Sequence, residues 1–404
     1  MKAYFTLLKN YAQAILFGWL LTFFSSFGQT FFVSLFVPGL LATFSLSKSA
    51  FGTYYAVATI IASFFLLRFG HVIDDRPVRP FTYKTIVLLA GACLLLGLAI
   101  HPAMIFVALI GLRLGGQGLM SHISQSVISR YFEADRGKAL SLTSLGFGVG
   151  EMIFPPVVAL IIAFFDWRIA LFAASGMLLL GFLPALRLMN LEPFDQMIST
   201  EKPAKGPEWR YFADLLKEKT FWIIALPTFM VPFTSTGLFF YQYVLADVRG
   251  WPIEWYAFCF TGYALMRLIF SLYGGILNDR FTAKNLFPFV LMPFIIGLGS
   301  LAWIPGKYAA LLFLLMTGVT MGLSSVVKAA VIAEIYGVKR IGQVKSLFSV
   351  GMVVCSALGP MLFGFLLDGG ITFSQIAWSN ALILFLLMVN SFRIMQPGIS
   401  AKII

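Results

Sequence analysis

The sequence has few charged residues and few cysteines, and each shortage argues against a class of protein. Only 11% of its 404 residues are Asp, Glu, Lys or Arg, whereas about a quarter of the residues in a soluble domain are charged. The three cysteines, Cys93, Cys259 and Cys355, lie in apolar runs without metal-ligand spacing, which argues against a disulfide framework and a metal site. We therefore expect no metal, no cofactor and a surface that faces lipid.

Long apolar runs are what the sequence has in abundance, since 59% of its residues are hydrophobic. A helix needs about 20 apolar residues to cross about 30 Å of hydrocarbon. None of the runs alternates with a period of two, which argues against strands. The sequence predicts an all-α membrane protein of twelve transmembrane helices. They cover roughly 12–42, 50–70, 82–100, 104–129, 138–164, 168–188, 220–245, 254–277, 285–304, 308–333, 343–367 and 373–395.

The positive charges are concentrated on one side of these spans. The net charge is +12, yet the charges are sparse and lie in short loops, so they do not predict a nucleic-acid partner. One side receives 21 Lys and Arg residues and the other four. The positive-inside rule then predicts that both termini are cytoplasmic. The first apolar stretch is too long for a cleaved signal and is expected to be a retained span.

The chain divides into two similar halves. The longest polar segment, 190–219, separates the spans six and six, and an offset near 204 residues aligns matching residues of the two halves. We predict two pseudo-symmetric six-helix bundles, residues 1–189 and 220–404, joined by a cytoplasmic linker. The end of that linker is expected to form a short interfacial helix over 209–221. Like-oriented halves place the substrate site between them at mid-membrane.

Several motifs resemble those of the major facilitator superfamily over the whole length of the chain. Gly275, Asp279 and Arg280 follow its Gly-x-x-x-Asp-Arg loop in the second half. In the first half Asp75 and Arg76 are in register, although Asp74 competes with Asp75 for the aspartate position. The resemblance implies the major facilitator fold. It also implies that Asp75, Arg76, Asp279 and Arg280 are gating residues whose cytoplasmic contacts break on inward opening.

Ionisable residues deep in a bilayer are costly, so each suggests a function. Glu151 is the one carboxylate well inside a predicted span, and Arg113 lies at similar depth. Glu151 is either a proton carrier or the partner of Arg113 in a permanent ion pair, and both interpretations stay open. At 100° per residue, Arg113, Gln117 and Ser124 form one polar stripe. We expect this stripe to face a central cavity, with Arg113 and Gln117 contacting substrate.

Arg267 in the eighth span is our strongest candidate for substrate binding. No acid lies near it along that span, and its guanidinium suits a carboxylate. The monocarboxylate and oxalate–formate transporters, which the chain distantly resembles, also have a key arginine in helix eight. Lys328 lies on the repeat equivalent of the polar stripe and either lines the cavity or extends toward the membrane surface. Further lining candidates are Gln29, Thr30, Tyr241 and Gln242.

These residues predict a secondary active transporter for a small organic anion such as a monocarboxylate. Such a transporter would work by alternating access, and coupling to protons, as symport or antiport, would drive it. One alternative is an exporter of amphipathic or drug-like compounds, for which the embedded cations are structural. A membrane enzyme is a remote alternative, because no catalytic cluster or nucleotide motif is present. We expect a monomer in a bacterial inner (plasma) membrane, with a small-molecule substrate, protons and the lipid bilayer as its partners.

Overall fold

The computed structural model describes residues 2–69, 73, 76–132, 135–196, 209–337 and 341–396. These residues are almost entirely helical and contain no strand. Among them are twelve helical segments long and apolar enough to cross a membrane, which confirms the predicted number. They are Ala12–Ser34, Lys48–Phe69, Val78–Gly97, Pro102–Tyr131, Arg136–Phe164, Trp167–Leu188, Lys219–Phe240, Ile253–Asn278, Ala283–Trp303, Tyr308–Tyr336, Gln343–Asp368 and Phe373–Met395.

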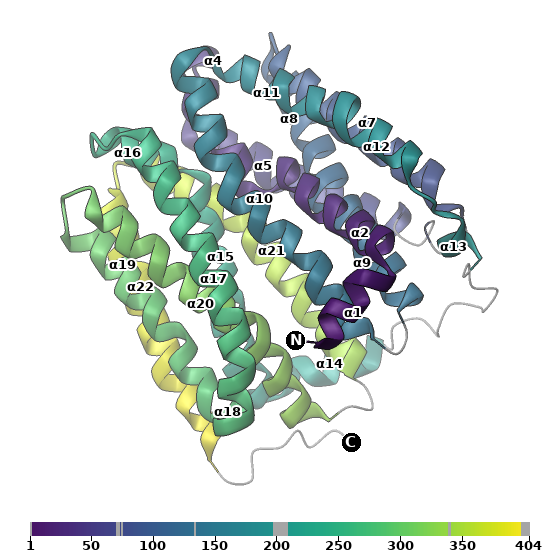
Figure 1. Ribbon diagram of the computed structural model, residues 1–404. Coiled ribbons are helices and arrows are strands. Elements are labelled where there is room, and N and C mark those ends of the chain that lie inside the picture. Colours follow the sequence, from purple (N-terminus) through teal and green to yellow (C-terminus); the bar gives the residue numbers. More distant parts are fainter. Residues whose placement is uncertain are drawn as a thin grey trace. The chain divides into compact units, whose positions relative to one another are not determined.

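The helices of the first half include several short pieces, because three of its spans change helix type along their length (Figure 1). The α-helices are α1 (Lys2–Asn10), α2 (Ala12–Phe24), α3 (Thr30–Ser34), α4 (Val37–Phe44), α5 (Lys48–Phe69), α7 (Val78–Gly97), α8 (Pro102–Leu112), α9 (Ser121–Tyr131), α10 (Arg136–Phe164), α11 (Trp167–Gly176), α12 (Leu183–Leu188) and α13 (Glu192–Asp195). Between them lie a 3₁₀ turn, η1 (Ser25–Gly28), and two π-helical segments, η2 (Arg113–Met120) and η3 (Met177–Phe182).

The second half has longer uninterrupted helices. They are α14 (Trp209–Lys217), α15 (Lys219–Phe240), α16 (Gln242–Val248), α17 (Ile253–Phe281), α18 (Ala283–Leu286), α19 (Met292–Trp303), α20 (Tyr308–Tyr336), α21 (Ile341–Asp368) and α22 (Phe373–Ser391), with the 3₁₀ turns η4 (Phe287–Leu291) and η5 (Phe392–Met395). The short α14 lies within the helix predicted over 209–221.

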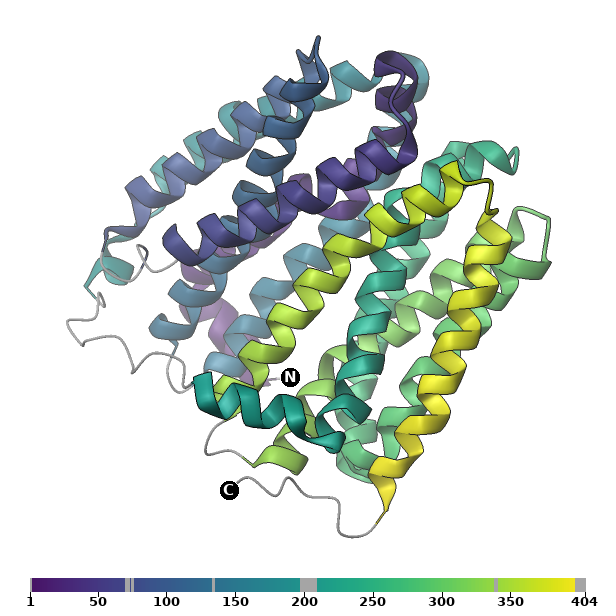
Figure 2. The ribbon, with the colours of Figure 1, turned by 180° about the vertical axis from the view of Figure 1, so that it is seen from behind.

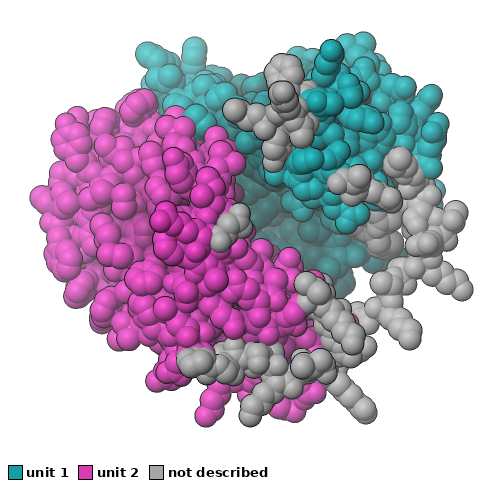
Figure 3. Space-filling view, turned by 60° about the horizontal axis from the view of Figure 1, so that its bottom comes forward, with its two compact units in different colours: residues 1–46, 54–202 teal, residues 47–53, 203–404 magenta. Residues whose placement is uncertain are grey.

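Contacts divide the chain into two compact units, coloured in Figure 3. The N-terminal unit comprises Met1–Leu46 and Tyr54–Lys202, and the C-terminal unit comprises Ser47–Thr53 and Pro203–Ile404. The boundary between Lys202 and Pro203 falls inside the predicted linker. The placement of Ser47–Thr53 with the C-terminal unit was not anticipated, since the sequence assigns them to the first bundle. The bundle limits 1–189 and 220–404 remain predictions.

Within each unit, the same pairs of spans pack against one another. In the N-terminal unit α2 packs on α10, and α7 packs on both α8 and α11. In the C-terminal unit α15 packs on α21, and α19 packs on both α20 and α22. Figures 1 and 2 show these helices running alongside one another within each unit. For these spans, the repeat in the sequence is also a repeat in packing partners.

Glycines allow the closest helix contacts in both units. A Cβ on Gly116 of η2 would lie 2.6 Å from the Cα of Gly28 in η1. A Cβ on Gly322 of α20 would lie 2.6 Å from the carbonyl oxygen of Arg267 in α17. Helix association in lipid depends on van der Waals packing, so backbones must approach closely at small residues. These glycines therefore determine which helix faces meet.

The first span is interrupted, whereas the sequence predicted one helix over 12–42. After η1, Gln29 adopts an extended conformation with φ −82° and ψ 156°, and the chain resumes as α3 and then α4. The turn is satisfied locally, because the Gln29 carbonyl accepts hydrogen bonds from the N–H groups of Phe32 and Val33, both at 3.2 Å. Non-helical backbone is tolerated at this depth where protein surrounds it. Apolarity alone did not reveal this break.

Candidate functional site

A pocket of about 220 Å³ lies inside the C-terminal unit. Its wall is mainly apolar, and two of its residues, Arg267 and Lys328, are cations. None of the residues that line it is an acid. They come from α15, α17, η4, α20 and α21 and are Pro227, Thr228, Val231, Pro232, Arg267, Phe287, Val290, Leu291, Met321, Ser324, Ser325, Val327, Lys328 and Met352.

Close packing of α17 on α20 brings the two cations to this pocket. A Cβ on Gly318 would collide with the Tyr263 carbonyl oxygen, and one on Gly322 with that of Arg267. Without side chains at these positions, the turn of α17 that carries Arg267 lies directly on α20, which carries Lys328. The predicted placement of both residues toward one cavity therefore has a counterpart in the structure, within a single unit.

The Lys328 ammonium has a weak partner. Its Nζ atom lies 3.2 Å from the Sδ atom of Met352 in α21, and a thioether is a poor hydrogen-bond acceptor. Lys328 is directed toward α21 and the pocket. A cation in apolar surroundings loses much of its hydration, so an anionic group that enters the pocket would gain a strong charge-assisted hydrogen bond.

The wall of the pocket that α15 contributes contains two prolines within the helix. Pro227 and Pro232 lie inside α15 and both line the pocket. Proline has no N–H, so each one leaves a carbonyl of the preceding turn without its helical donor. The carbonyls concerned are those of Ile223 and Thr228, and the hydroxyl of Thr228 separately donates to the Ile224 carbonyl at 2.7 Å. The helix that forms this wall of the pocket is therefore weakened at two of its turns.

Arg113 has a different environment, in the interior of the N-terminal unit. It is 3% exposed. Its Nε donates to Thr59 Oγ1 and its Nη1 to the Gly28 carbonyl, both at 3.1 Å. Its guanidinium also lies over the Tyr55 ring, 4.9 Å from the centroid. Among the residues that the structure describes it makes no ion pair, so the Arg113–Glu151 pair considered from the sequence is not the arrangement found.

The polar stripe of the fourth span faces the first span. Ser124 donates to the Gly18 carbonyl at 2.9 Å, Arg113 binds the Gly28 carbonyl, and the backbone of Gln117 lies against Gly28. The calculation of 100° per residue assumed a regular α-helix, but Arg113–Met120 is π-helical, which alters the angular spacing. The substrate roles of Arg113 and Gln117 remain predictions, and the contacts observed are between helices.

Two predicted residues of the first span lie at its break. Thr30 is hydrogen bonded through Oγ1 to the Tyr55 hydroxyl at 2.6 Å, and Tyr55 in turn contacts Arg113. Gln29 is the extended residue itself and is half-buried. Thr30 and Arg113, far apart in the sequence, are thus joined through Tyr55. Whether Gln29 and Thr30 contact substrate stays a prediction.

Glu151 lies on α10 and is 9% exposed. The preceding residue, Gly150, packs against the Ser26 hydroxyl of η1, so the Glu151 turn lies beside the break in the first span. This position is compatible with proton carriage, and the role stays a prediction.

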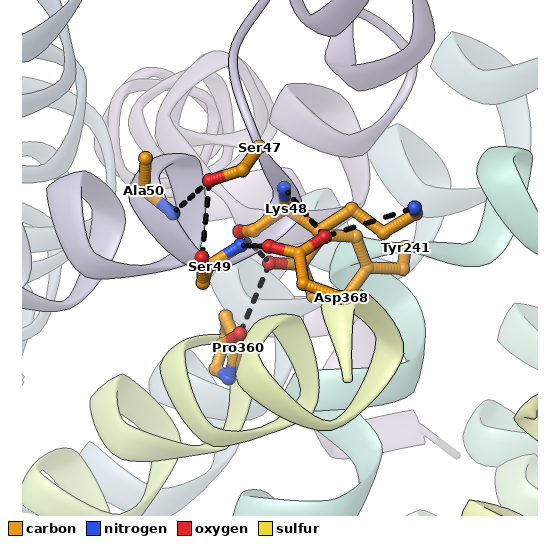
Figure 4. A network of polar contacts seen from close by, with 7 residues as sticks. All are labelled: Ser47, Lys48, Ser49, Ala50, Tyr241, Pro360 and Asp368. Carbon is orange, nitrogen blue, oxygen red and sulfur yellow. Dashed lines mark hydrogen bonds and ion pairs between the residues drawn. The ribbon is translucent and has the colours of Figure 1, made fainter. Parts of the chain in front are cut away.

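Tyr241 and Gln242 are fully buried at the junction of α15 and α16, each 0% exposed. The Tyr241 hydroxyl lies 2.6 Å from the Lys48 carbonyl and 3.1 Å from the Pro360 carbonyl and donates to both (Figure 4). The predicted contact of both side chains with substrate stays a prediction. The Tyr241 contacts observed join the beginning of α5 to the C-terminal unit.

The structure describes only part of the predicted gate. Arg76 is exposed just before α7, and Arg280 lies over the Phe281 ring at 5.2 Å near the end of α17. Asp75 lies outside the described residues, as does the side chain of Asp279, so their gating contacts stay predictions. The sequence analysis did not identify a nearby acid, Glu334 of α20. Its carboxylate accepts hydrogen bonds from the N–H groups of Ala283 and Lys284 at 2.8 and 3.1 Å.

Sequence reasoning also missed Tyr55, Thr59 and Asp368. Tyr55 and Thr59 are four residues apart, and residues at that spacing share one helix face; together they signalled a polar face on the second span. Asp368 is followed by two glycines at the end of the eleventh run, which marked a helix terminus but not its partner. Neither the spacing of Tyr55 and Thr59 nor the two glycines after Asp368 predicts which helix these residues contact.

Two units with matching span packing and a cation-lined pocket define a polytopic membrane transporter built from a repeat. The Major Facilitator Superfamily model matches residues 18–259 and 253–402. The chain is 26% identical over 373 residues to Monocarboxylate transporter 13 of Rattus norvegicus, covering 87% of this chain and 82% of that protein.

Solved transporters share the fold at low sequence identity. The nucleoside transporter NupG matches with a TM-score of 0.77 at 14% identity, covering 95% of this chain and 99% of NupG. An inward-facing, unoccupied bacterial homolog of the human lysosomal transporter Spinster matches with a TM-score of 0.69 at 15% identity, covering 95% and 94%.

The chain belongs to the Major Facilitator Superfamily. It is an integral membrane transporter with a small-molecule substrate, and not an enzyme. The predictions of fold class, family and transport are thereby confirmed.

Proposed function

We propose that the chain is a secondary carrier for a small organic anion, which it moves by alternating access and couples to protons. The observation that carries this proposal is the pocket lined by Arg267 and Lys328 with no acid among its lining residues. A planar guanidinium suits bidentate carboxylate binding, and the ammonium of Lys328 can bind a second oxygen. The apolar wall would accommodate the carbon skeleton of the anion.

Two further observations support this proposal. The chain is similar to a protein named as a monocarboxylate transporter, whose name denotes a substrate with one carboxylate. Glu151 is buried beside the break in the first span, where loss and gain of a proton would change the local charge. We assign proton carriage to Glu151 and substrate contact to Arg267 and Lys328.

Orientation and assembly complete the proposal. The 21-to-four distribution of Lys and Arg supports cytoplasmic termini, and we propose a monomer in a bacterial inner membrane. The exporter alternative has one observation in its favour, which is the mainly apolar wall of the pocket. An uncharged amphipathic compound would fit that wall without using the cations, so the two functions differ in their dependence on Lys328.

The test is uptake by the purified protein in proteoliposomes, with a panel of carboxylates and with or without a pH gradient. Lys328→Met removes the ammonium at nearly constant length, and we expect carboxylate affinity to fall about 10- to 100-fold, the range for a hydrogen bond to a charged group. Lys217→Met is the matched control, because Lys217 lies on α14 and pairs with Asp214 at 3.2 Å. Unchanged carboxylate affinity, with competition by neutral amphiphiles, would favour the exporter.

A further inference from the structure

The beginning of α5 belongs to a different unit from the rest of the helix. The continuous helix α5 runs from Lys48 to Phe69, yet Ser47–Thr53 pack with the C-terminal unit and the residues from Tyr54 onward with the N-terminal unit. We infer that Asp368 and Tyr241 form a releasable clamp on the start of α5, which must open when the carrier changes conformation. This inference rests on the proposed alternating-access mechanism.

Asp368 caps the N-terminus of α5 (Figure 4). Its Oδ1 accepts a hydrogen bond from the Lys48 N–H at 3.2 Å, and its Oδ2 accepts one from the Ser49 N–H at 2.7 Å. The first N–H groups of a helix lack partners within the helix, and the positive end of its dipole attracts a carboxylate. The Lys48 ammonium lies 3.9 Å from Oδ1. One carboxylate from the end of α21 thus holds the first turn of α5.

Tyr241 supplies the second half of the clamp. Its hydroxyl bridges the Lys48 carbonyl in α5 and the Pro360 carbonyl in α21. A Cβ on Gly52 or Gly364 would lie 2.6 Å from that oxygen, so glycine at both positions makes room for the phenol. The hydroxyl is therefore enclosed between two helices, and its position depends on both of them.

An aromatic contact accompanies the polar contacts of Asp368 and Tyr241. Phe51 of α5 stacks on Phe240 of α15, with ring centroids 5.3 Å apart, and both rings are fully buried. By contrast, the side chains of Lys48 and Asp368 are 32% and 26% exposed. Water can replace the Asp368 hydrogen bonds as they break, which lowers the cost of release. The contact combines a small apolar core with polar groups at the water boundary, as a separable joint requires.

Continuity of α5 makes the clamp part of any conformational change. If one unit turns relative to the other, α5 must either bend between Thr53 and Tyr54 or leave the C-terminal unit. Bending an α-helix breaks backbone hydrogen bonds at the bend. Gly52 is the glycine next to this boundary, and it is packed against the Pro360 carbonyl and the Tyr241 hydroxyl, which leaves that turn little room to bend. Separation at the clamp replaces the partly exposed hydrogen bonds of Asp368 by water and leaves the backbone hydrogen bonds of α5 intact, so it is the easier route.

The first test measures opening directly, with spin labels in a cysteine-free background. Labels are placed at Ile100→Cys, which is 85% exposed in the parent, and Gly306→Cys, where a Cβ meets nothing within 4 Å. In Asp368→Ala we expect the population of the longer label-to-label distance to rise about tenfold, as loss of a charge-assisted bond predicts, and in Tyr241→Phe about threefold, because its bonds to the carbonyls join neutral groups. Unchanged distance distributions in both variants would overturn the inference.

Matched controls exist for both substitutions. Asp166→Ala removes an aspartate at the N-cap of α11 that makes no capping hydrogen bond. Tyr243→Phe removes a buried hydroxyl that has no hydrogen-bond partner in the described part of the chain. Both controls should keep the parent distribution. Equal shifts in the controls and in the clamp variants would also overturn the inference, because the effect would then not come from these contacts.

A second test prevents release. Lys48→Cys with Asp368→Cys, joined by a short bifunctional thiol reagent, should stop transport while leaving binding intact, and a reductant that cleaves the linker should restore transport. Continued transport by fully cross-linked protein would overturn the inference. The spin-label experiment needs no substrate, so it remains decisive even if the chain proves not to carry organic anions.

Discussion

The fourth span of the N-terminal unit and the tenth span of the C-terminal unit occupy equivalent places in the repeat but differ in structure. The fourth span contains the π-helical segment Arg113–Met120 and sets Gly116 against the first span and Gly115 against the third. The tenth span is one unbroken helix, Tyr308–Tyr336, and sets its glycines against the eighth. At the offset of 204 residues, Arg113 corresponds to Thr317, so the two units carry their cations at different positions.

This difference separates two uses of a buried cation. Arg113 is enclosed by Thr59, Gly28 and Tyr55, so its donors are used within the protein. Lys328 lines a pocket, and its ammonium has the Met352 thioether as its hydrogen-bond partner in the described part of the chain. Both residues face the cost of a charge in an apolar medium. The N-terminal unit offsets that cost with its own neutral groups, and we propose that the C-terminal unit does so in part with substrate.

The largest expected effect comes from Arg113→Met. We expect the free energy of unfolding to fall by about 2–4 kcal/mol, because the buried acceptors of Gly28 and Thr59 lose their donor. The measurement is thermal or denaturant unfolding in detergent. Thr317→Val is the control at the equivalent position, where only a bond within α20 at 2.6 Å is lost. If Arg113→Met keeps its stability but loses substrate affinity, Arg113 is a substrate ligand and the contrast between the units fails.

Arg267→Lys sharpens the same comparison in the C-terminal unit. The charge is kept but the planar fork is lost, so affinity for a carboxylate should fall about tenfold while the unfolding midpoint stays unchanged. The readout is substrate affinity, measured by direct binding. Arg393→Lys, an exposed position in η5, should change neither quantity. Full affinity in Arg267→Lys would remove Arg267 from the site and favour the exporter function.

Glu151→Gln tests whether the N-terminal unit carries the proton. We expect pH-driven accumulation to stop, while exchange of labelled for unlabelled substrate continues, because exchange needs no net proton movement. Glu254→Gln, at an exposed acid in the first turn of α17, should leave accumulation intact. Loss of exchange together with a lower unfolding midpoint would instead assign Glu151 a structural role.

The smallest effect concerns two acids near the ends of the spans. Asp195 of the N-terminal unit accepts a hydrogen bond from the Val78 N–H at 2.7 Å, whereas neither Glu218 oxygen accepts one from the residues described in the C-terminal unit. Burial raises the pKa of Glu218 above its ordinary 4.5. The folded state therefore holds this proton more tightly, and stability falls as pH rises from 4.5 through the raised pKa.

Glu218→Gln removes this loss of stability with rising pH. We therefore expect a melting temperature roughly one degree higher at neutral pH, and a melting temperature that varies less with pH below neutrality. Asp195→Asn should lower the melting temperature at neutral pH, since it weakens a charge-assisted bond at the start of α7. Melting curves across a pH series distinguish the two acids. A lower melting temperature for Glu218→Gln at neutral pH would mean that the charged form of Glu218 is stabilising.

Part of the candidate site was accessible from the sequence. The cost of burying charge identified Arg113, Glu151, Arg267 and Lys328 as residues that need a partner, and the structure places two of them in one pocket. The stripe calculation assumed a regular α-helix where Arg113–Met120 is π-helical, and it could not name the partners of Arg113, because they lie on other spans. Tyr241 was treated as a lining residue, although its partners, Lys48 and Pro360, are more than 100 positions away in the chain.

The sequence by itself determined the twelve spans, the repeat and the family, because hydrocarbon thickness imposes run length on any chain that crosses it. It also determined which residues carry a charge inside a span. Only the tertiary structure decided where each charge is satisfied, where the first span breaks, and which unit the start of α5 joins. These outcomes depend on contacts between helices distant in the sequence, and apolar runs of similar composition carry no record of which faces meet.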